Sequence, residues 1–172
     1  DNPVLFLLVN DPNLKADEHL NQLPLTKNFG KILGGIVART GWDNSPDSKD
    51  VIAEIKGGGY HFANHQHPDA GAMQIFHHGM QLGDIGLYLS YGSAYDYNFN
   101  KRSISHSMML ANDPNEKWLF RAKDNDGGAR FNQRFPMSPS ETVNDPWFDN
   151  GQVLSVNFGP SATKPLFSYF KA

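Results

Sequence analysis

Short runs of alternating or β-branched apolar residues recur along the whole chain and are separated by turn residues. Seven runs have the length of single strands: residues 32–39, 51–56, 72–78, 104–111, 117–122, 152–158 and 166–170. The 16 glycines and 11 prolines are spread between the runs instead of forming one linker. This pattern is typical of antiparallel sheets. It predicts an all-β fold, an antiparallel β-sandwich of two packed sheets, in a single domain over residues 1–172.

One segment, residues 14–23, has the pattern of a helix. It follows Asn13, a favourable N-cap residue, it carries acidic residues in its first turn, and Pro24 ends it. We expect residues 124–128 (DNDGG) to form a hairpin turn and residues 136–146 to form an irregular loop. The sequence therefore predicts at most one short helix.

The charge of the chain is nearly balanced, with 15 lysines and arginines, 18 aspartates and glutamates, and a net charge of −3. This balance does not favour nucleic acid or an anionic membrane surface as a partner. The longest apolar run, residues 4–9, is far shorter than the ~20 residues of a membrane-spanning helix. The chain has no cysteine, which excludes thiolate ligands and a thiol nucleophile. A metal here would need histidine and carboxylate ligands.

Five of the seven histidines lie between positions 61 and 78. His65 and His67 are two residues apart, so on a strand they would project to the same face. Asp84 would follow the return strand of a hairpin, and His106 lies inside the run at residues 104–111. His106 alone is better explained as a hydrogen-bonded core residue than as a ligand, but imidazoles and a carboxylate from neighbouring strands together favour a zinc or iron site.

Two other metal-binding patterns compete with this interpretation. A cupin site needs a glutamate shortly after its histidines, and no glutamate occurs between Glu54 and Glu116. His67, Asp69 and His106 satisfy the short two-histidine, one-carboxylate pattern of non-haem iron oxygenases. Pro68 would disturb the strand between these ligands, and Asp69 is otherwise expected to cap a turn. The oxygenase remains the second hypothesis, and a non-catalytic carbohydrate-binding sandwich is the third.

Several separated motifs resemble the heparinase II/III family of bacterial polysaccharide lyases, the heparinase II branch most of all. The resemblance covers roughly residues 23–114. Its motifs are residues 37–42 (VARTGW), 64–71 (NHQHPDAG), 74–76 (QIF), 84–88 (DIGLY), 91–93 (YGS), 101–106 (KRSISH) and 112–114 (NDP). The resemblance implies β-elimination on a uronic-acid polysaccharide, heparin or heparan sulfate, by a periplasmic or secreted enzyme.

In this family an α-toroid domain precedes the β-sandwich domains, and the substrate lies between them. The chain resembles only the first part of the sandwich region, so the resemblance implies that it belongs to a larger lyase. Its partners would then be the polysaccharide and the missing α-toroid part. A face without its opposing wall could also self-associate into a homo-oligomer. We therefore expect the chain alone to lack lyase turnover.

The resemblance also implies roles for individual residues. The zinc ligands would be His67, Asp84 and His106, and we expect the zinc to have a structural or second-shell role, because β-elimination needs no activated water.

A second set of residues would meet the sugar. The resemblance makes His65 the active-site histidine and places Tyr88 and Tyr95 near the cleft as further catalytic residues. It makes Asn64 an adjacent polar contact for the substrate. Lys101 and Arg102 form the one adjacent basic pair of the chain, which could contact sulfate or uronate groups or could be a solvated strand end.

Overall fold

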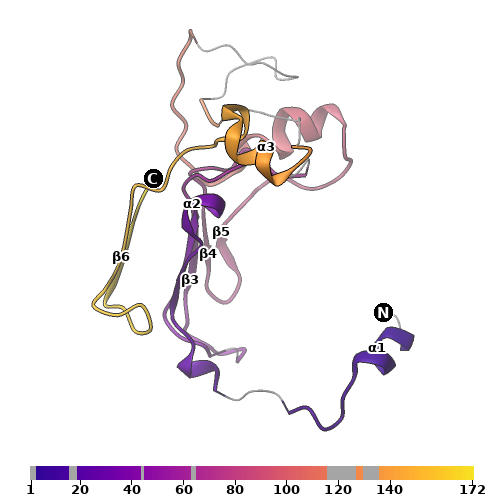
Figure 1. The fold of residues 1–172 in the computed structure, drawn as a ribbon, viewed down its shortest axis with the longest axis vertical. Helices are drawn as coiled ribbons and strands as arrows, with labels where there is room; N and C mark the ends of the chain where they lie inside the picture. Colours follow the sequence, from indigo (N-terminus) through magenta and orange to yellow (C-terminus); the bar gives the residue numbers. More distant parts are fainter. Residues whose placement is uncertain (1–2, 16–18, 44, 63–64, 116–126, 130–135) are drawn as a thin grey trace.

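The computed structural model describes residues 3–15, 19–43, 45–62, 65–115, 127–129 and 136–172. Its main element is a five-stranded antiparallel sheet in which each strand pairs with the next along the chain (Figure 1). The strands are β1 (Thr26–Asn28), β2 (Gly35–Arg39), β3 (Ile52–Lys56), β4 (Met73–Phe76) and β5 (Met80–Leu82). A second sheet has two antiparallel strands, β6 (Ser155–Gly159) and β7 (Phe167–Lys171).

The β6–β7 hairpin lies beside the five-stranded sheet (Figure 1). At one end, the amide of Leu25 donates a hydrogen bond of 3.2 Å to the carbonyl of Thr163. At the other, a Cβ atom on Gly57 would lie 2.2 Å from the ring of Phe170, so only glycine allows β7 to approach this closely. These contacts confirm the predicted all-β, sandwich-like fold.

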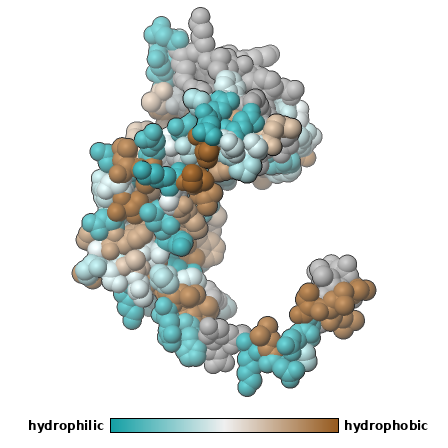
Figure 2. All heavy atoms as spheres, in the orientation of Figure 1, coloured by the Kyte–Doolittle hydropathy of each residue, from teal (hydrophilic) through white to brown (hydrophobic). Residues whose placement is uncertain are grey.

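The helices are short, but their positions correct the prediction. Of the expected helix at residues 14–23, the described part contains only a 3₁₀ turn, η1 (Leu20–Gln22). Short α-helices occur instead at α1 (Pro3–Val9), α2 (Gly30–Leu33) and α3 (Pro139–Asn144). None of the described helices has the length and apolar character needed to cross a membrane. Four apolar side chains of α1 lie at the surface, as Figure 2 shows: Val4, Leu7, Leu8 and Val9.

The predicted irregular loop at 136–146 is wrong because the sequence there contains a helix start. The Ser138 side chain caps α3 by accepting a hydrogen bond of 3.1 Å from the amide of Glu141, and Pro139 occupies the first helical position. Both are standard helix N-terminal features. The 3₁₀ turn η4 (Pro146–Phe148) follows directly.

The predicted strand at 104–111 is also wrong. This stretch follows a π-helical turn, η2 (Asp96–Asn100), and begins within a 3₁₀ turn, η3 (Ser103–Ser105), after which it has no strand. The predicted strand at 117–122 lies outside the described residues, as does most of the predicted hairpin turn at 124–128.

Buried positions divide into a small apolar set and a larger polar set. Among the described residues, the fully buried apolar side chains are Ile36, Ala72 and Phe148. Most buried polar side chains gather in η2, η3 and their flanks: Asp96, Asn100, Lys101, Arg102, Ser103, Ser105 and His106. This polar segment carries the candidate site.

Candidate metal centre and active site

Three of the predicted ligands converge on one point. One ligand atom from each of His67, Asp84 and His106 lies within 4.8 Å of the others. His67 belongs to the connection between β3 and β4, Asp84 follows β5, and His106 follows η3. The spacing in the sequence therefore identified residues that the fold brings together from three separate segments.

Backbone pairing places Asp84 opposite His106. The amide of Ile85 donates to the carbonyl of Ser105 at 2.9 Å, and the Ser107 hydroxyl donates to the carbonyl of Gly83 at 2.9 Å. Asp84 is thus held on both sides by the neighbours of His106. The Ser103 hydroxyl donates to the carbonyl of Pro68, which ties the connection carrying His67 to the same turn.

A backbone carbonyl orients the ring of His106 on the side away from the other two ligands. Its Nδ1 lies 2.8 Å from the carbonyl oxygen of Arg102, which can only accept, so Nδ1 carries the proton. Nε2 is thus the nitrogen that faces His67 and Asp84 and would bind a metal. A backbone carbonyl behind a histidine is the usual way to orient a metal ligand.

The separations between the donor atoms suit a small divalent cation. His67 Nδ1 lies 3.0 Å from His106 Nε2, and Asp84 Oδ2 lies 3.6 Å from the same nitrogen. Ligands at ~2.0–2.1 Å around tetrahedral zinc are about 3.3 Å apart. Burial and the neighbouring His106 lower the pKa of His67, which favours the neutral, ligating imidazole. Two imidazoles and one carboxylate therefore fit zinc.

The local backbone differs from the prediction although the residues agree. His65 and His67 do not lie on a strand, so the same-face argument for them is wrong. His106 is buried as expected but is not on a strand either. Asp69 lies outside the converging group, and its carboxylate forms an ion pair with Lys56. The predicted turn at Asp69 is confirmed by a hydrogen bond of 2.9 Å from the amide of Ala72 to its carbonyl.

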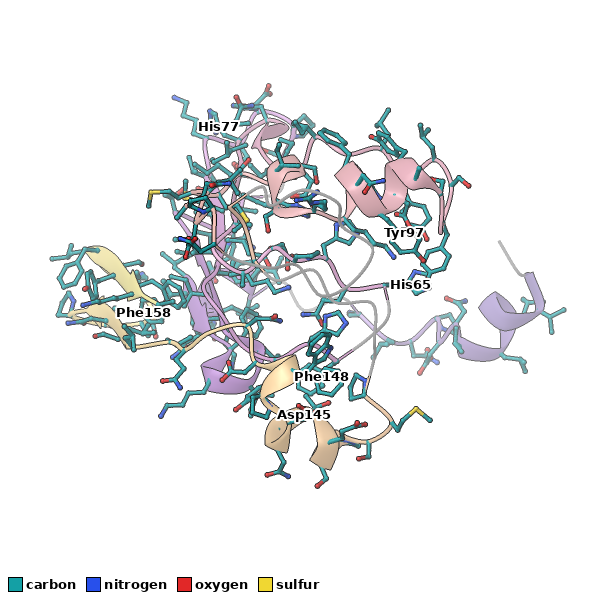
Figure 3. All side chains as sticks on the ribbon, turned by 90° about the horizontal axis from the view of Figure 1, so that it is seen from above. His65, His77, Tyr97, Asp145, Phe148 and Phe158 are labelled. Carbon is teal, nitrogen blue, oxygen red and sulfur yellow. The ribbon has the colours of Figure 1, made fainter. Side chains whose placement is uncertain are left out.

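An exposed histidine and tyrosine pair is joined to this centre through the connection that carries His67. His65 Nδ1 lies 3.5 Å from the hydroxyl oxygen of Tyr88. The His65 ring also stacks on the ring of Tyr91, with centroids 4.7 Å apart and an interplanar angle of 22°. Figure 3 shows His65 toward the side of the molecule where η2 carries Tyr97. The pair is open to a large ligand, since Tyr88 is 59% exposed.

Tyr95 supports the segment that carries Tyr88. Its hydroxyl accepts a hydrogen bond of 3.1 Å from the amide of Leu87, and its ring packs on Phe99 with centroids 5.5 Å apart. Tyr95 is therefore placed to hold the backbone beside Tyr88, and its catalytic role stays a prediction. Asn64, predicted as a substrate contact, lies outside the described residues.

The predicted basic pair is buried, which corrects its interpretation as a surface feature. Lys101 is 0% exposed and Arg102 is also buried. Lys101 Nζ lies 3.6 Å from Asp96 Oδ2 and 4.2 Å from the centroid of the Tyr91 ring. Lys101 is thus neither a solvated strand end nor an exposed contact for sulfate in this conformation.

Sequence reasoning missed Asp96, and it placed Tyr91 only in a motif and in an aromatic cluster that could stack on sugar rings or pack across strands. Burial opposes ionisation of Asp96, but hydrogen bonds from the Gly92 amide and the Asn100 side chain, together with Lys101, leave its pKa below the usual range. The run of aromatic residues from 88 to 99 was the available signal. It did not indicate which ring would meet a histidine, because that depends on the π-helical turn.

No protein-family model matches this chain, and no curated protein matches it either. The resemblance to the heparinase II/III family therefore stays a prediction from the motifs of the sequence.

Proposed function

We propose that this chain is the β-sheet part of a zinc-containing lyase that cleaves uronate polysaccharides of the heparin and heparan sulfate type. The observation that carries the proposal is the convergence of His67, Asp84 and His106 in a polar, partly buried centre, with an exposed His65–Tyr88 pair attached to it. The family motifs supply the substrate class. The structure supplies the means by which these residues could act together.

Uronate elimination requires two proton transfers. A base removes the C5 proton, the electrons of that C–H bond form the C4–C5 double bond, and the C4–oxygen bond breaks as the leaving oxygen gains a proton. Neutral His65 can accept a proton or donate to the substrate carboxylate, and the Tyr88 hydroxyl can donate to the leaving oxygen. A donor at the carboxylate also stabilises the charge that develops there.

The metal ligands have a supporting role in this proposal. When bound, zinc would supply positive charge that neutralises Asp84 and joins three chain segments at one point. His67 lies two residues after His65, so fixing His67 restricts the connection that presents His65 to the substrate. We therefore assign zinc to positioning, as the chemistry needs no activated water.

The two other hypotheses gain unequal support. The iron oxygenase would need Asp69 at the metal, but its carboxylate is engaged by Lys56 and Asp84 lies at the centre instead. The exposed ring of Tyr88 is suited to stacking on a sugar, which favours a carbohydrate-binding domain as the second candidate.

The first test compares binding of matched ligands. The zinc-loaded chain is titrated with heparin oligosaccharides and with the same oligosaccharides after reduction of their uronate carboxylates to alcohols. We expect the affinity for the reduced ligands to be lower by about tenfold, because a charge-assisted hydrogen bond is lost. Equal affinity for both ligands would contradict recognition of the uronate.

The second test separates catalysis from binding. Elimination is followed by the ultraviolet absorbance of the unsaturated uronate, in the longer lyase that the resemblance implies. His65→Ala should lower turnover by ~10²-fold or more and leave the zinc content intact. The control is His78→Asn, at the exposed turn between β4 and β5, where asparagine tolerates the φ of 54°. Binding of uronate without elimination would replace the lyase by the carbohydrate-binding candidate, and loss of zinc in His65→Ala would make His65 a ligand.

A further inference from the structure

The ring of Tyr91 connects the exposed His65 to a buried charge. One contact of the ring is the stacked imidazole of His65, at 4.7 Å between centroids. Another is the ammonium group of Lys101, whose Nζ lies 4.2 Å from the Tyr91 centroid. Tyr91 itself is 45% exposed, so its orientation is not enforced by surrounding core packing.

The charge next to the Tyr91 ring is the buried ammonium of Lys101, which is paired with Asp96. Lys101 Nζ has no hydrogen-bond partner among the described residues, so its described charge partners are Asp96 and the rings of Tyr91 and Tyr97. Asp96 is fixed by hydrogen bonds from the Gly92 amide at 2.9 Å and the Asn100 side chain at 3.1 Å. A buried ammonium in such surroundings interacts strongly with an aromatic face.

We propose that Tyr91 is a positioning residue that orients the His65 ring toward Tyr88, and that the buried Lys101–Asp96 pair fixes Tyr91 in turn. The importance of this orientation for catalysis rests on the proposed function, while the orientation itself does not. His65 lies in a connection without regular structure, and its described hydrogen-bonding and stacking partners are Tyr88 and Tyr91. Without the Tyr91 ring, the imidazole would lose the contact that restricts its rotation.

Packing alone does not account for this arrangement. An apolar side chain at position 101 would fill the space under Tyr91 without the cost of burying a charge. The ammonium adds an attraction centred on the ring face, and this attraction selects one orientation of the ring. Preorganisation of a histidine in this way is what a reaction on a bound polymer requires.

The test uses nuclear magnetic resonance of the chain without polysaccharide. The readout is the nuclear Overhauser effect between the ring protons of His65 and Tyr88, neither of which is mutated. We expect the effect to be lost in Tyr91→Leu and kept in Tyr91→Phe, because phenylalanine retains both the stacking and the cation–π face. The control is Phe167→Leu, which removes an exposed aromatic ring of β7 in the two-stranded sheet and should leave the effect unchanged.

A second variant tests the buried pair. Asp96→Asn with Lys101→Met removes both charges together, which buried ion pairs often tolerate, and circular dichroism checks the fold. We expect a weaker nuclear Overhauser effect between His65 and Tyr88 in this double variant. The single variant Lys101→Arg, which keeps Asp96 and a positive charge, should show the native effect. An unchanged effect in Tyr91→Leu would overturn the proposal, and an unchanged effect in the neutralised pair would overturn the role of Lys101. Failure to bind or cleave heparin would refute the proposed function without altering these spectra.

Discussion

His61 should make the stability of this protein sensitive to mild acid. The residue is 4% exposed, its amide donates a hydrogen bond of 2.7 Å to the carbonyl of Phe148, and its ring stacks on the Phe148 ring with centroids 6.5 Å apart. Its Nε2 has no hydrogen-bond partner among the described residues. Burial, and secondarily the positive charge of Lys56, lower the pKa of His61 from 6.5 to about 4.

The sign and size of the effect follow from proton linkage. Between pH 6.5 and about pH 4, the unfolded chain binds a proton at His61 and the folded chain does not. The free energy of unfolding therefore falls as the pH falls through this window. At about 1.4 kcal/mol for each pH unit, the whole window corresponds to about 3 kcal/mol. This is a large share of the ~5–15 kcal/mol that stabilises a typical domain.

The assay compares the chain with His61→Phe, which keeps a ring on Phe148 but cannot be protonated. Urea unfolding is followed by circular dichroism from about pH 7 to about pH 4, in chelator so that metal release does not contribute. We expect the variant to gain stability relative to the native chain on acidification, by about 3 kcal/mol near the lower end. His78→Asn, at an exposed position with a φ of 54° that asparagine tolerates, should follow the native curve. Parallel curves for His61→Phe and the native chain would refute the reasoning.

Three further predictions concern the site and one helix. Replacing any one of the three predicted zinc ligands by alanine should abolish stoichiometric zinc in elemental analysis and lower the melting temperature, whereas Asp69→Ala should keep the zinc. In the longer lyase, Tyr95→Phe should reduce turnover more than Tyr97→Phe, because the Tyr95 hydroxyl holds the Leu87 amide; equal losses would contradict this. Ser138→Ala should cost about 1 kcal/mol in urea unfolding through loss of the α3 cap, and Ser140→Ala should cost less.

Strands were predictable where apolar alternation coincided with pairing between neighbours in the chain. The run at 51–56 became β3, and the runs at 152–158 and 166–170 became the β6–β7 hairpin. The run at 32–39 was predicted as one strand, but Gly34 divides it into α2 and β2. Gly34 adopts a φ of 70°, and a Cβ atom there would lie 2.3 Å from the carbonyl carbon of Gly58. A constraint of this kind depends on a distant segment and has no local pattern.

The prediction of a strand at 104–111 was wrong because polar side chains of this run are buried. Ser105 and His106 are buried, whereas Ile104 is 46% exposed. The Ser105 hydroxyl donates to the carbonyls of Asn100 at 2.8 Å and Arg102 at 3.0 Å, so side chains satisfy backbone groups that a strand would have paired. Serine offers the backbone this alternative, and hydrophobic alternation does not detect it.

The burial of polar side chains in this segment also explains why the ligands were predictable and their surroundings were not. Histidine and aspartate stand out in a sequence because few other residues bind metals, and the family motifs then indicated His67, Asp84 and His106 among them. The position of Lys101 could not, because a lysine next to an arginine is usually solvated. Here, Asp96, Asn100 and Ser105 form hydrogen bonds around η2 and η3, and Lys101 is paired with Asp96 and with aromatic rings. Polar networks of this kind restrict the orientation of their side chains. A segment built in this way would suit the proposed site, in which the ring of His65 keeps one orientation while its exposed side stays open to a polysaccharide.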